Sequence, residues 1–272
     1  MKEVIVSRQN PLIKTVCSLL EKKHRKAMGL FRFDGAKLFY EACLCGLCIE
    51  YVIVSEKANF YCMQVLERAL EEGAVLEDRV YTVSESVFDK ISEEKSPEGI
   101  VTVAKELATV NNMTDDACLI TERKLLLAES LRDPGNLGTV IRSCAALGIE
   151  RLIISSDCAD IYNPKTIRAA MGGLFRLKIT VVHQETMPIV IGQLRKQGRR
   201  VFAAALSDTA IELGKFSLGE TDCFVIGNEG HGLSTDVINA CDSACIIPMM
   251  QGCESLNASA AAAICIWETV RA

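Results

Sequence analysis

The stretch IIPMMQGCESLNAS, from Ile246 to Ser259, decides the fold of the second half of the chain. It runs directly into the apolar stretch AAAAICIW, so that a polar loop stands where a buried strand meets a helix. Two earlier segments have the same design: DPGNLGTVIRSCAALGI, from Asp133 to Ile149, and FVIGNEGHGLS, from Phe224 to Ser234. Each places Gly, Asn and a charged residue where an apolar run ends. Three such loops predict one composite pocket for a small ligand.

Apolar segments alternate with helical patterns through this half of the chain. Strands are predicted at 125–129, 151–155, 177–182, 200–205, 223–226 and 244–247, and the helices between them include 137–147, 188–197 and 257–267. Strands that are apolar on both faces and separated by helices are typical of a parallel α/β sheet, whose ligands lie at the carboxyl ends of the strands.

The first half predicts a small α/β domain of its own. Its helices are expected at 11–27, where Asn10 and Pro11 form a good helix start, and at 36–46 and 60–72. Strands are expected at 50–54 and near 80 and 100. A polar stretch then marks a linker. We therefore expect an N-terminal domain over 1–106, a linker over 107–123 and a catalytic domain over 124–272.

Composition excludes several classes of protein. No apolar run approaches the roughly 18 residues that span a bilayer, and the N-terminus has no signal-peptide pattern, so a cytoplasmic protein without membrane contact is expected. The 13 cysteines are expected to be reduced. Cys45 and Cys48 form a lone CxxC without a second ligand pair nearby, so no metal site is expected.

The formal net charge of −5 is unevenly distributed. Residues 1–40 hold nine Lys or Arg against three acidic residues, and the remainder of the chain is strongly acidic. Such asymmetry is typical of a local contact with a polyanion, although a solvated helix face would give the same pattern. The candidate RNA ligands of this segment are Arg8, Lys14, Arg25 and Arg32.

The three loops together resemble the signature motifs of the SpoU/TrmH family of RNA ribose 2′-O-methyltransferases, part of the SPOUT superfamily. Motif one corresponds to Asn136 with Arg142, motif two to the stretch GNEG at 227–230, and motif three to IPM at 247–249 with ESLN at 254–257. The resemblance covers 124–271 strongly and 7–53 more loosely. A dinucleotide-binding fold fits less well, because DPGNLG follows the first strand in place of GxGxxG.

The resemblance implies S-adenosyl-L-methionine as cofactor, held in a C-terminal trefoil knot, and a preceding substrate-binding domain like a ribosomal protein. Relatives bind this cofactor largely through main-chain groups, and the matching positions are Ala204, Gly227, Ile247 and Leu256. Glycines suit such a site because they let the main chain approach a ligand closely, although an ordinary turn also explains them. Gln251 stands where motif three usually has glycine.

The resemblance also implies the catalytic residues Asn136, Arg142, Glu229, Ser255 and Asn257. Arg142 is the principal one, and electrostatic activation of the hydroxyl suits a guanidinium better than proton abstraction. Asn136 is expected to cap its helix, and Asn257 to cap the last one. Lys165 and Arg168, near the start of a short helix after Pro164, are candidate RNA phosphate ligands.

The expected function is transfer of a methyl group from S-adenosylmethionine to a ribose 2′-hydroxyl of RNA by a homodimer. Ribosomal RNA is favoured over tRNA because the N-terminal domain resembles those of ribosomal RNA enzymes. A tRNA 2′-O-methyltransferase, a silent RNA-binding or ribosome-assembly factor, and an enzyme of antibiotic resistance remain alternatives. The five motif residues together argue against the silent protein, which would be free to lose them.

Overall fold

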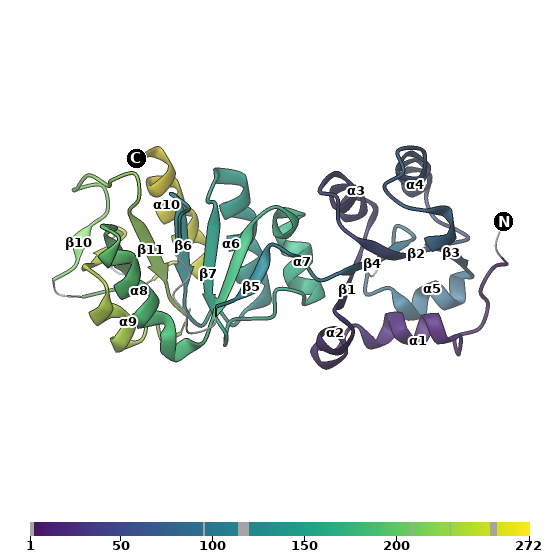
Figure 1. Cartoon of the computed structure of the whole chain (residues 1–272), viewed down its shortest axis with the longest axis horizontal. Coiled ribbons are helices and arrows are strands. Elements are labelled where there is room, and N and C mark those ends of the chain that lie inside the picture. Colours follow the sequence, from purple (N-terminus) through teal and green to yellow (C-terminus); the bar gives the residue numbers. More distant parts are fainter. Residues whose placement is uncertain (1–2, 95, 114–119, 208, 229, 251–254) are drawn as a thin grey trace. The chain divides into compact units, whose positions relative to one another are not determined.

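The computed structural model describes residues 3–94, 96–113, 120–207, 209–228, 230–250 and 255–272. The chain divides into two compact units, which are considered one at a time (Figure 1). Unit 1 comprises Met1–Leu107 together with Tyr162–Phe175, and unit 2 comprises Ala108–Ile161 and Arg176–Ala272.

Unit 1 is an α/β unit with a mixed four-stranded sheet in the order β1-β4-β2-β3. Strand β4 is antiparallel to β1 and β2, whereas β2 and β3 are parallel. The strands are β1 (Leu30–Asp34), β2 (Ile49–Ser55), β3 (Val80–Val83) and β4 (Ile100–Lys105). The helices are α1 (Pro11–Ser18), α2 (Lys22–Met28), α3 (Ala36–Leu44), α4 (Phe60–Glu71), α5 (Glu85–Ile91) and α7 (Pro164–Ala170), with short 3-10 turns at Glu77–Arg79 and Gly173–Phe175.

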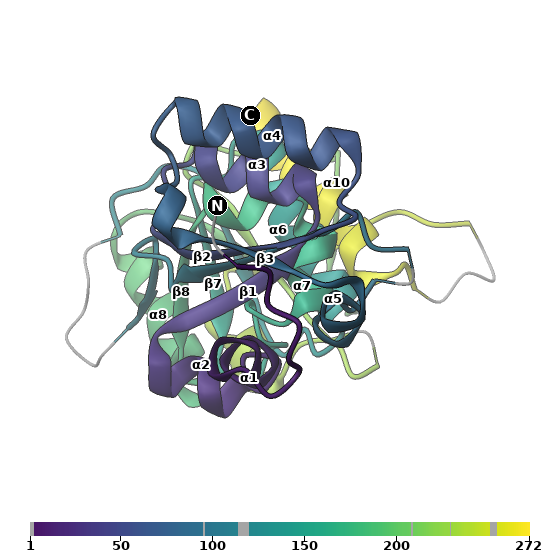
Figure 2. The ribbon, with the colours of Figure 1, turned by 90° about the vertical axis from the view of Figure 1, so that its right-hand side faces the viewer.

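Helices cover both faces of this sheet, as Figure 2 shows. Helices α1 and α5 pack on the face to which Ile53 and Val101 point, and α3 and α4 pack on the face to which Val52 and Val54 point. Neighbouring residues of β2 therefore belong to different cores, because side chains alternate along a strand.

The segment Tyr162–Phe175 belongs to unit 1 although it follows residues of unit 2 in sequence. The ring of Tyr162 lies 4.7 Å from that of Phe31, and the ring of Phe175 lies 5.3 Å from that of Phe33, between centroids. The Tyr162 hydroxyl accepts the N–H of Leu107 at 2.8 Å. Aromatic packing on β1 thus holds this segment.

Unit 2 is built on an eight-stranded sheet in the order β10-β12-β9-β11-β6-β7-β8-β5. Every strand pair described in it is parallel. The strands are β5 (Val110–Asn112), β6 (Leu125–Ala128), β7 (Arg151–Ser155), β8 (Lys178–Val182), β9 (Val201–Ala204), β10 (Ile211–Glu212), β11 (Cys223–Ile226) and β12 (Ser243–Ile246). The helices are α6 (Pro134–Leu147), α8 (Met187–Lys196), α9 (Thr235–Ala240) and α10 (Ala258–Arg271), with a 3-10 turn at Gln184–Thr186.

Helices α8 and α9 cover one face of this sheet, where Leu125, Leu127 and Val225 are fully buried. Helices α6 and α10 pack against each other, and α10 also packs on β11. Strands buried on both faces require nearly continuous apolar runs, which is why the sequence predicts them well. The parallel α/β fold predicted for this half of the chain is confirmed.

Three expectations from the sequence differ from the structure. The helix expected at 11–27 is two helices, because the chain turns after Ser18. The stretch expected as a linker over 107–123 includes β5, which pairs with β8 at the edge of the sheet. Asn136 does not cap α6, because Asp133 is the capping residue and accepts the N–H of Asn136 at 2.8 Å.

Most of the cysteines that the structure describes are buried thiols. Burial raises the pKa of Cys62, Cys223 and Cys241 to about 12, which makes these thiols poor nucleophiles. Among the described residues, no group of three or more His, Cys, Asp or Glu side chains could hold a metal ion. Within the same residues, no helix has both the length and the apolar character needed to cross a membrane.

Candidate functional site

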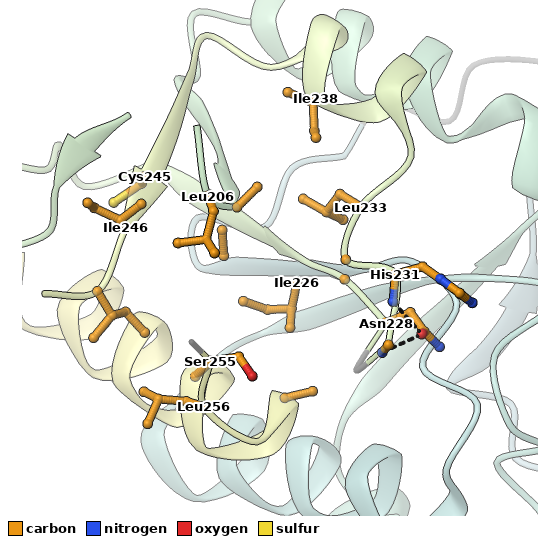
Figure 3. A pocket seen from close by; sticks show the side chains of 18 of the residues that line it. Leu206, Ile226, Asn228, His231, Leu233, Ile238, Cys245, Ile246, Ser255 and Leu256 are labelled. Atoms are coloured by element: carbon orange, nitrogen blue, oxygen red, sulfur yellow. Dashed lines mark hydrogen bonds between the residues drawn. The ribbon is translucent and has the colours of Figure 1, made fainter. Parts of the chain in front are cut away.

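A cavity of about 490 Å³ lies at the carboxyl ends of three adjacent strands, β9, β11 and β12. The chain leaves these strands there through three loops, and the start of α10 closes the cavity (Figure 3). The loops after β11 and β12 are two of the three predicted ones, whereas no described residue of the first predicted loop, 133–149, lines the cavity. We call it the loop pocket. Its lining includes the four positions expected to bind the cofactor, namely Ala204, Gly227, Ile247 and Leu256.

The lining of the loop pocket is mixed in character. Apolar side chains come from all three loops and from α9 and α10, including Leu206, Leu233, Ile238 and Leu256 (Figure 3). The polar side chains among the lining residues are those of Asn228, His231 and Ser255. Among the lining residues that the structure describes, none is Lys, Arg, Asp or Glu, and His231 is the one ionisable side chain apart from Cys245.

Gly227 is buried at the end of β11 and cannot carry a side chain. A Cβ atom at this position would lie 2.5 Å from the carbonyl carbon of Gly232 and 2.6 Å from the nitrogen of Leu233. Both atoms belong to the main chain, so relieving the overlap would require the backbone of the loop to shift. The glycine is therefore needed because the loop after β11 folds back on this strand. This supports the alternative of a turn, and the close approach of a ligand stays a prediction.

The loop after Gly227 is closed on itself by Asn228. The main chains of Asn228 and Gly232 exchange two hydrogen bonds of 3.0 Å. The Asn228 side-chain oxygen also accepts the N–H groups of Gly230 at 2.8 Å and His231 at 3.2 Å (Figure 3). Asn228 thus sets the main chain that lines one wall of the pocket. Glu229, an expected catalytic residue, lies outside the described residues, as do Gln251 and Gly252.

Two of the expected catalytic residues meet where α6 and α10 begin. The Asn257 side-chain nitrogen donates to the Asn136 side-chain oxygen at 3.0 Å. Asn257 is the N-cap of α10, and its own oxygen accepts the N–H of Ser259 at 2.9 Å. Capping and the link to motif one are therefore compatible at Asn257. Ser255 lies two residues earlier and lines the loop pocket.

Arg142 is exposed on α6 and makes no hydrogen bond or ion pair within the described residues. Residues six apart on a helix are separated by about 120° around its axis and about 9 Å along it. Arg142 therefore projects from a different face of α6 than Asn136, which faces Asn257. Arg142 is also absent from the described lining of the loop pocket.

Four of the expected RNA ligands are exposed, all in unit 1. They are Arg8, Lys14, Lys165 and Arg168. Lys165 and Arg168 lie on α7, whose N-cap Asn163 accepts the N–H of Lys165 at 2.9 Å. The predicted short helix after Pro164 is thus confirmed, although its packing assigns it to unit 1 and not to the catalytic domain in which we expected it.

Arg25 and Arg32 are not on the surface, so the structure does not support them as RNA ligands. Their exposed fractions are 3% and 1%. Arg25 donates to the carbonyl oxygens of Leu19 and Leu20, at 2.7 Å each, and holds the turn between α1 and α2. Arg32 donates to Asp34 and to the carbonyl of Ile91, at 2.6 Å each. These hydrogen bonds tie elements of unit 1 together, which a count of charges along the sequence does not reveal.

Asn228 is a site residue that the sequence interpretation did not single out. It lies within motif two, in a glycine-flanked loop directly after a buried strand. Asn side chains in such positions commonly bond to the main chain two residues on, so the signal was present in the pattern GNEG.

Two family models match this chain. The model of the SpoU rRNA Methylase family matches residues 123–267, and that of the MRM3-like substrate binding domain matches residues 10–102. A curated relative from Bacillus subtilis (strain 168), the 23S rRNA (guanosine(2553)-2′-O)-methyltransferase RlmP, is 28% identical over 97% of this chain and 97% of its own.

Solved structures resemble the whole chain as well. A crystal structure of an RNA 2′-O ribose methyltransferase is 28% identical with a TM-score of 0.80, covering 99% of this chain and 98% of its own. An AdoMet-bound rRNA methyltransferase from Sinorhizobium meliloti is 25% identical with a TM-score of 0.79, covering 99% of this chain and 97% of its own.

Proposed function

Because the chain belongs to the SpoU rRNA methylase family, we propose that it transfers the methyl group of S-adenosylmethionine to a ribose 2′-hydroxyl of ribosomal RNA. The observation that carries this proposal is the loop pocket, in which the loops of motifs two and three meet at the carboxyl ends of β9, β11 and β12, with Asn136 of motif one bonded to Asn257 beside them. The curated relative RlmP acts on 23S rRNA, and the match extends over both units. A ribosomal RNA substrate also fits a cytoplasmic location.

The residues of the loop pocket suit S-adenosylmethionine. A cavity of about 490 Å³ is within the usual size of small-molecule sites. Apolar side chains such as Leu206 and Leu233 can contact an adenine ring, and main-chain groups after Gly227 can bond to its polar edge. Because the described lining has no Lys or Arg, it does not repel a sulfonium cation.

When bound, the cofactor supplies an electrophilic methyl group on a positively charged sulfur. The chain must then place the ribose hydroxyl in line with that methyl and stabilise the negative charge that develops on the oxygen. Arg142 is the proposed source of this stabilisation, since its guanidinium is unpaired within the described residues and stays charged. Asn257, Asn136, Ser255 and Glu229 are proposed to position Arg142, the phosphate and the ribose.

We include a homodimer in this proposal. Arg142 and Asn136 project from different faces of α6, so one chain does not bring both to one point near the loop pocket. A second subunit that contributes Arg142 to the partner's pocket would complete the site. The trefoil knot implied by the resemblance is likewise proposed for the chain around the loops after β11 and β12.

We further propose that RNA binds to unit 1 through exposed cations. Because Arg25 and Arg32 are buried, the predicted RNA ligands that remain are Arg8, Lys14, Lys165 and Arg168. Burial and the charge of Asp34 raise the pKa of Glu94, and the charge of Arg168 opposes this effect, so an acidic group lies near Arg168. RNA phosphate would compete with that carboxylate for Arg168.

The decisive experiment maps 2′-O-methyl groups in ribosomal RNA and tRNA from cells with and without this gene. We expect one ribosomal position to lose its methyl group, and purified protein to restore it with labelled S-adenosylmethionine. Loss of a methyl group from tRNA alone would show that tRNA is the substrate. Cofactor binding without the loss of any methyl group would favour a silent RNA-binding protein.

A further inference from the structure

A chain of hydrogen bonds joins the end of β6 to the loop pocket, through a residue with unusual main-chain geometry. Ser130 lies two residues beyond β6 and is buried, with φ of 56°. A residue with a Cβ atom seldom adopts this left-handed conformation, so the surrounding structure must hold it there. Motif one begins three residues later, at Asp133.

All three polar groups of Ser130 are bonded. Its N–H donates to the Ser155 hydroxyl oxygen at 2.8 Å, and its own hydroxyl donates to Asp157 Oδ2 at 2.6 Å. Its carbonyl oxygen accepts the side-chain N–H of Asn228 at 2.8 Å. Ser130 therefore connects the loop of motif one to the loop of motif two.

Asp157 holds this arrangement in place. Its Oδ1 accepts the Ser155 hydroxyl at 2.6 Å, and its Oδ2 also accepts Arg132 at 3.2 Å. Burial raises the pKa of Asp157, but the hydrogen bonds from Ser130, Ser155 and Arg132 outweigh burial, so the pKa is lower than usual. The carboxylate is thus charged at neutral pH and bonds strongly to both hydroxyls.

The geometry points to Asp157 as a positioning residue for the loop pocket, and this inference rests on the proposed function. Asp157 fixes Ser130, and Ser130 fixes the Asn228 amide. The other end of that amide folds the main chain of Gly230 and His231 (Figure 3). A loop held in its bound shape loses less entropy when a ligand binds. Asp157 contacts no ligand in this scheme, since the described lining of the pocket does not include it.

The test measures calorimetric affinity for S-adenosylmethionine and S-adenosylhomocysteine in the full-length protein. Asp157→Asn keeps the shape of the side chain and removes its charge. We expect both ligands to bind about tenfold more weakly, the usual consequence of losing a hydrogen bond to a charged group.

Asp242→Asn is a matched control. The Asp242 carboxylate also accepts an arginine, Arg195, at 2.9 Å and a main-chain N–H, that of Val201, at 2.8 Å. Its side chain is 28% exposed, compared with 23% for Asp157. It lies at the amino ends of β9 and β12, away from the loops. We expect Asp242→Asn to lower the unfolding temperature but leave ligand affinity unchanged.

A second variant separates positioning from stability. Ser130→Gly removes the hydroxyl that bonds to Asp157 but relieves the left-handed conformation, so its effects on stability oppose each other. We expect a near-normal unfolding temperature with about tenfold weaker binding. The double variant should bind no more weakly than Asp157→Asn alone, because both changes break the same chain of bonds.

The outcomes are distinct. If wild-type protein binds neither ligand, the proposed function fails and this inference fails with it. If wild type binds and Asp157→Asn and Ser130→Gly bind equally well, only the inference is overturned. Equal losses of affinity in Asp157→Asn and Asp242→Asn would also overturn it, because they would show a general effect of stability. If Asp157→Asn does not fold, Ser130→Gly decides the question.

Discussion

The two ends of the parallel sheet in unit 2 differ in how their polar groups are used. At the amino ends of the strands, charged groups are paired: Glu122 bonds to Arg151 at 2.7 Å and to Lys178 at 3.0 Å, and Asp242 bonds to Arg195 at 2.9 Å. At the carboxyl ends, Ser130 has a left-handed main chain, and Leu206 and Met250 are more than 70% exposed.

This difference separates stability from function. Removing one partner of a paired, partly buried charge destabilises the sheet, and charges paired in this way are not free to bind a ligand. Strained main chain and exposed apolar side chains reduce stability locally, and such features persist where a ligand or partner uses them. If the comparison is correct, variants at the carboxyl ends change binding and catalysis, and variants at the amino ends change stability alone.

The largest effect is expected for Arg142→Ala. Methyl transfer should fall by about 100-fold or more, the usual loss when a group that stabilises transition-state charge is removed. Affinity for S-adenosylmethionine and the unfolding temperature should stay near wild type, because Arg142 is exposed and unpaired within the described residues. Single-turnover kinetics on the mapped RNA measure the rate of methyl transfer, and calorimetry measures the cofactor affinity and the unfolding temperature.

Mixing Arg142→Ala with Asn257→Ala sharpens this prediction. If Arg142 serves the partner's pocket, the mixture should recover part of the activity once subunits exchange. Near-normal turnover by Arg142→Ala alone would overturn its proposed role. A monomer in sedimentation would overturn only the dimer.

Gly227→Ala should reduce both stability and cofactor affinity. The added Cβ would lie 2.5 Å from main-chain atoms of Gly232, so the pocket loop must shift. Overpacking of this kind costs about 1–3 kcal/mol. Chemical denaturation and calorimetry measure the two losses. Gly230→Ala is the control for stability, since the nearest atom to its Cβ would be the Asn228 side-chain oxygen at an ordinary 3.5 Å. An equal loss of stability there would contradict the steric explanation.

Glu122→Gln tests the amino end of the sheet. The hydrogen bond from Arg151 and that from Lys178 outweigh burial and lower the pKa of Glu122 from 4.5 to about 2. A carboxyl group whose pKa is lower in the folded state stabilises the fold above its unfolded value of 4.5. That contribution is lost as the pH falls from 4.5 to about 2.

We therefore expect Glu122→Gln to lower the unfolding free energy at pH 7 by about 3 kcal/mol, on the scale of 1.4 kcal/mol per unit of pKa. The difference in unfolding free energy between wild type and Glu122→Gln should become smaller as the pH falls towards 2. Cofactor affinity should not change. A clear loss of affinity at constant stability would break the division between the two ends of the sheet.

The smallest effect is expected for Lys165→Ala with Arg168→Ala. RNA affinity should fall severalfold at low salt, and the slope of log affinity against log salt should become shallower by about 1 for each phosphate that the variant no longer binds. The exposed Lys215, paired with Glu212, provides a control variant in unit 2. Equal slopes in all variants would show that α7 does not bind phosphate.

The role of unit 1 in RNA binding cannot be tested by simply deleting residues 1–105. That deletion would remove β1, on which Tyr162 and Phe175 pack, and would expose an aromatic cluster of the remaining chain. Point substitutions on α1 and α7 avoid this problem. The sequence could not reveal it, because Tyr162–Phe175 follows β7 in the order of the chain and joins unit 1 only through tertiary packing.

The sequence by itself determined six of the eight strands described in unit 2 and the meeting of the loops after β11 and β12, whereas β5 was expected as linker and β10 was not predicted. Strands buried on both faces need continuous apolar runs, and the carboxyl ends of parallel strands lie at one edge of the sheet, so local pattern and topology suffice for both. The family resemblance added Ala204, Gly227, Ile247 and Leu256, which the structure places around one pocket.

Only the tertiary structure decided which charges are available. Arg25 and Arg32 look like Lys14 in the sequence, yet they are buried and bonded to carbonyl groups, whereas Lys14 is exposed. Asp157 lies far from Asn228 in the chain but is two hydrogen-bonded steps away in space. Burial and the partners of a polar group depend on segments distant in sequence, and no local pattern carries that information.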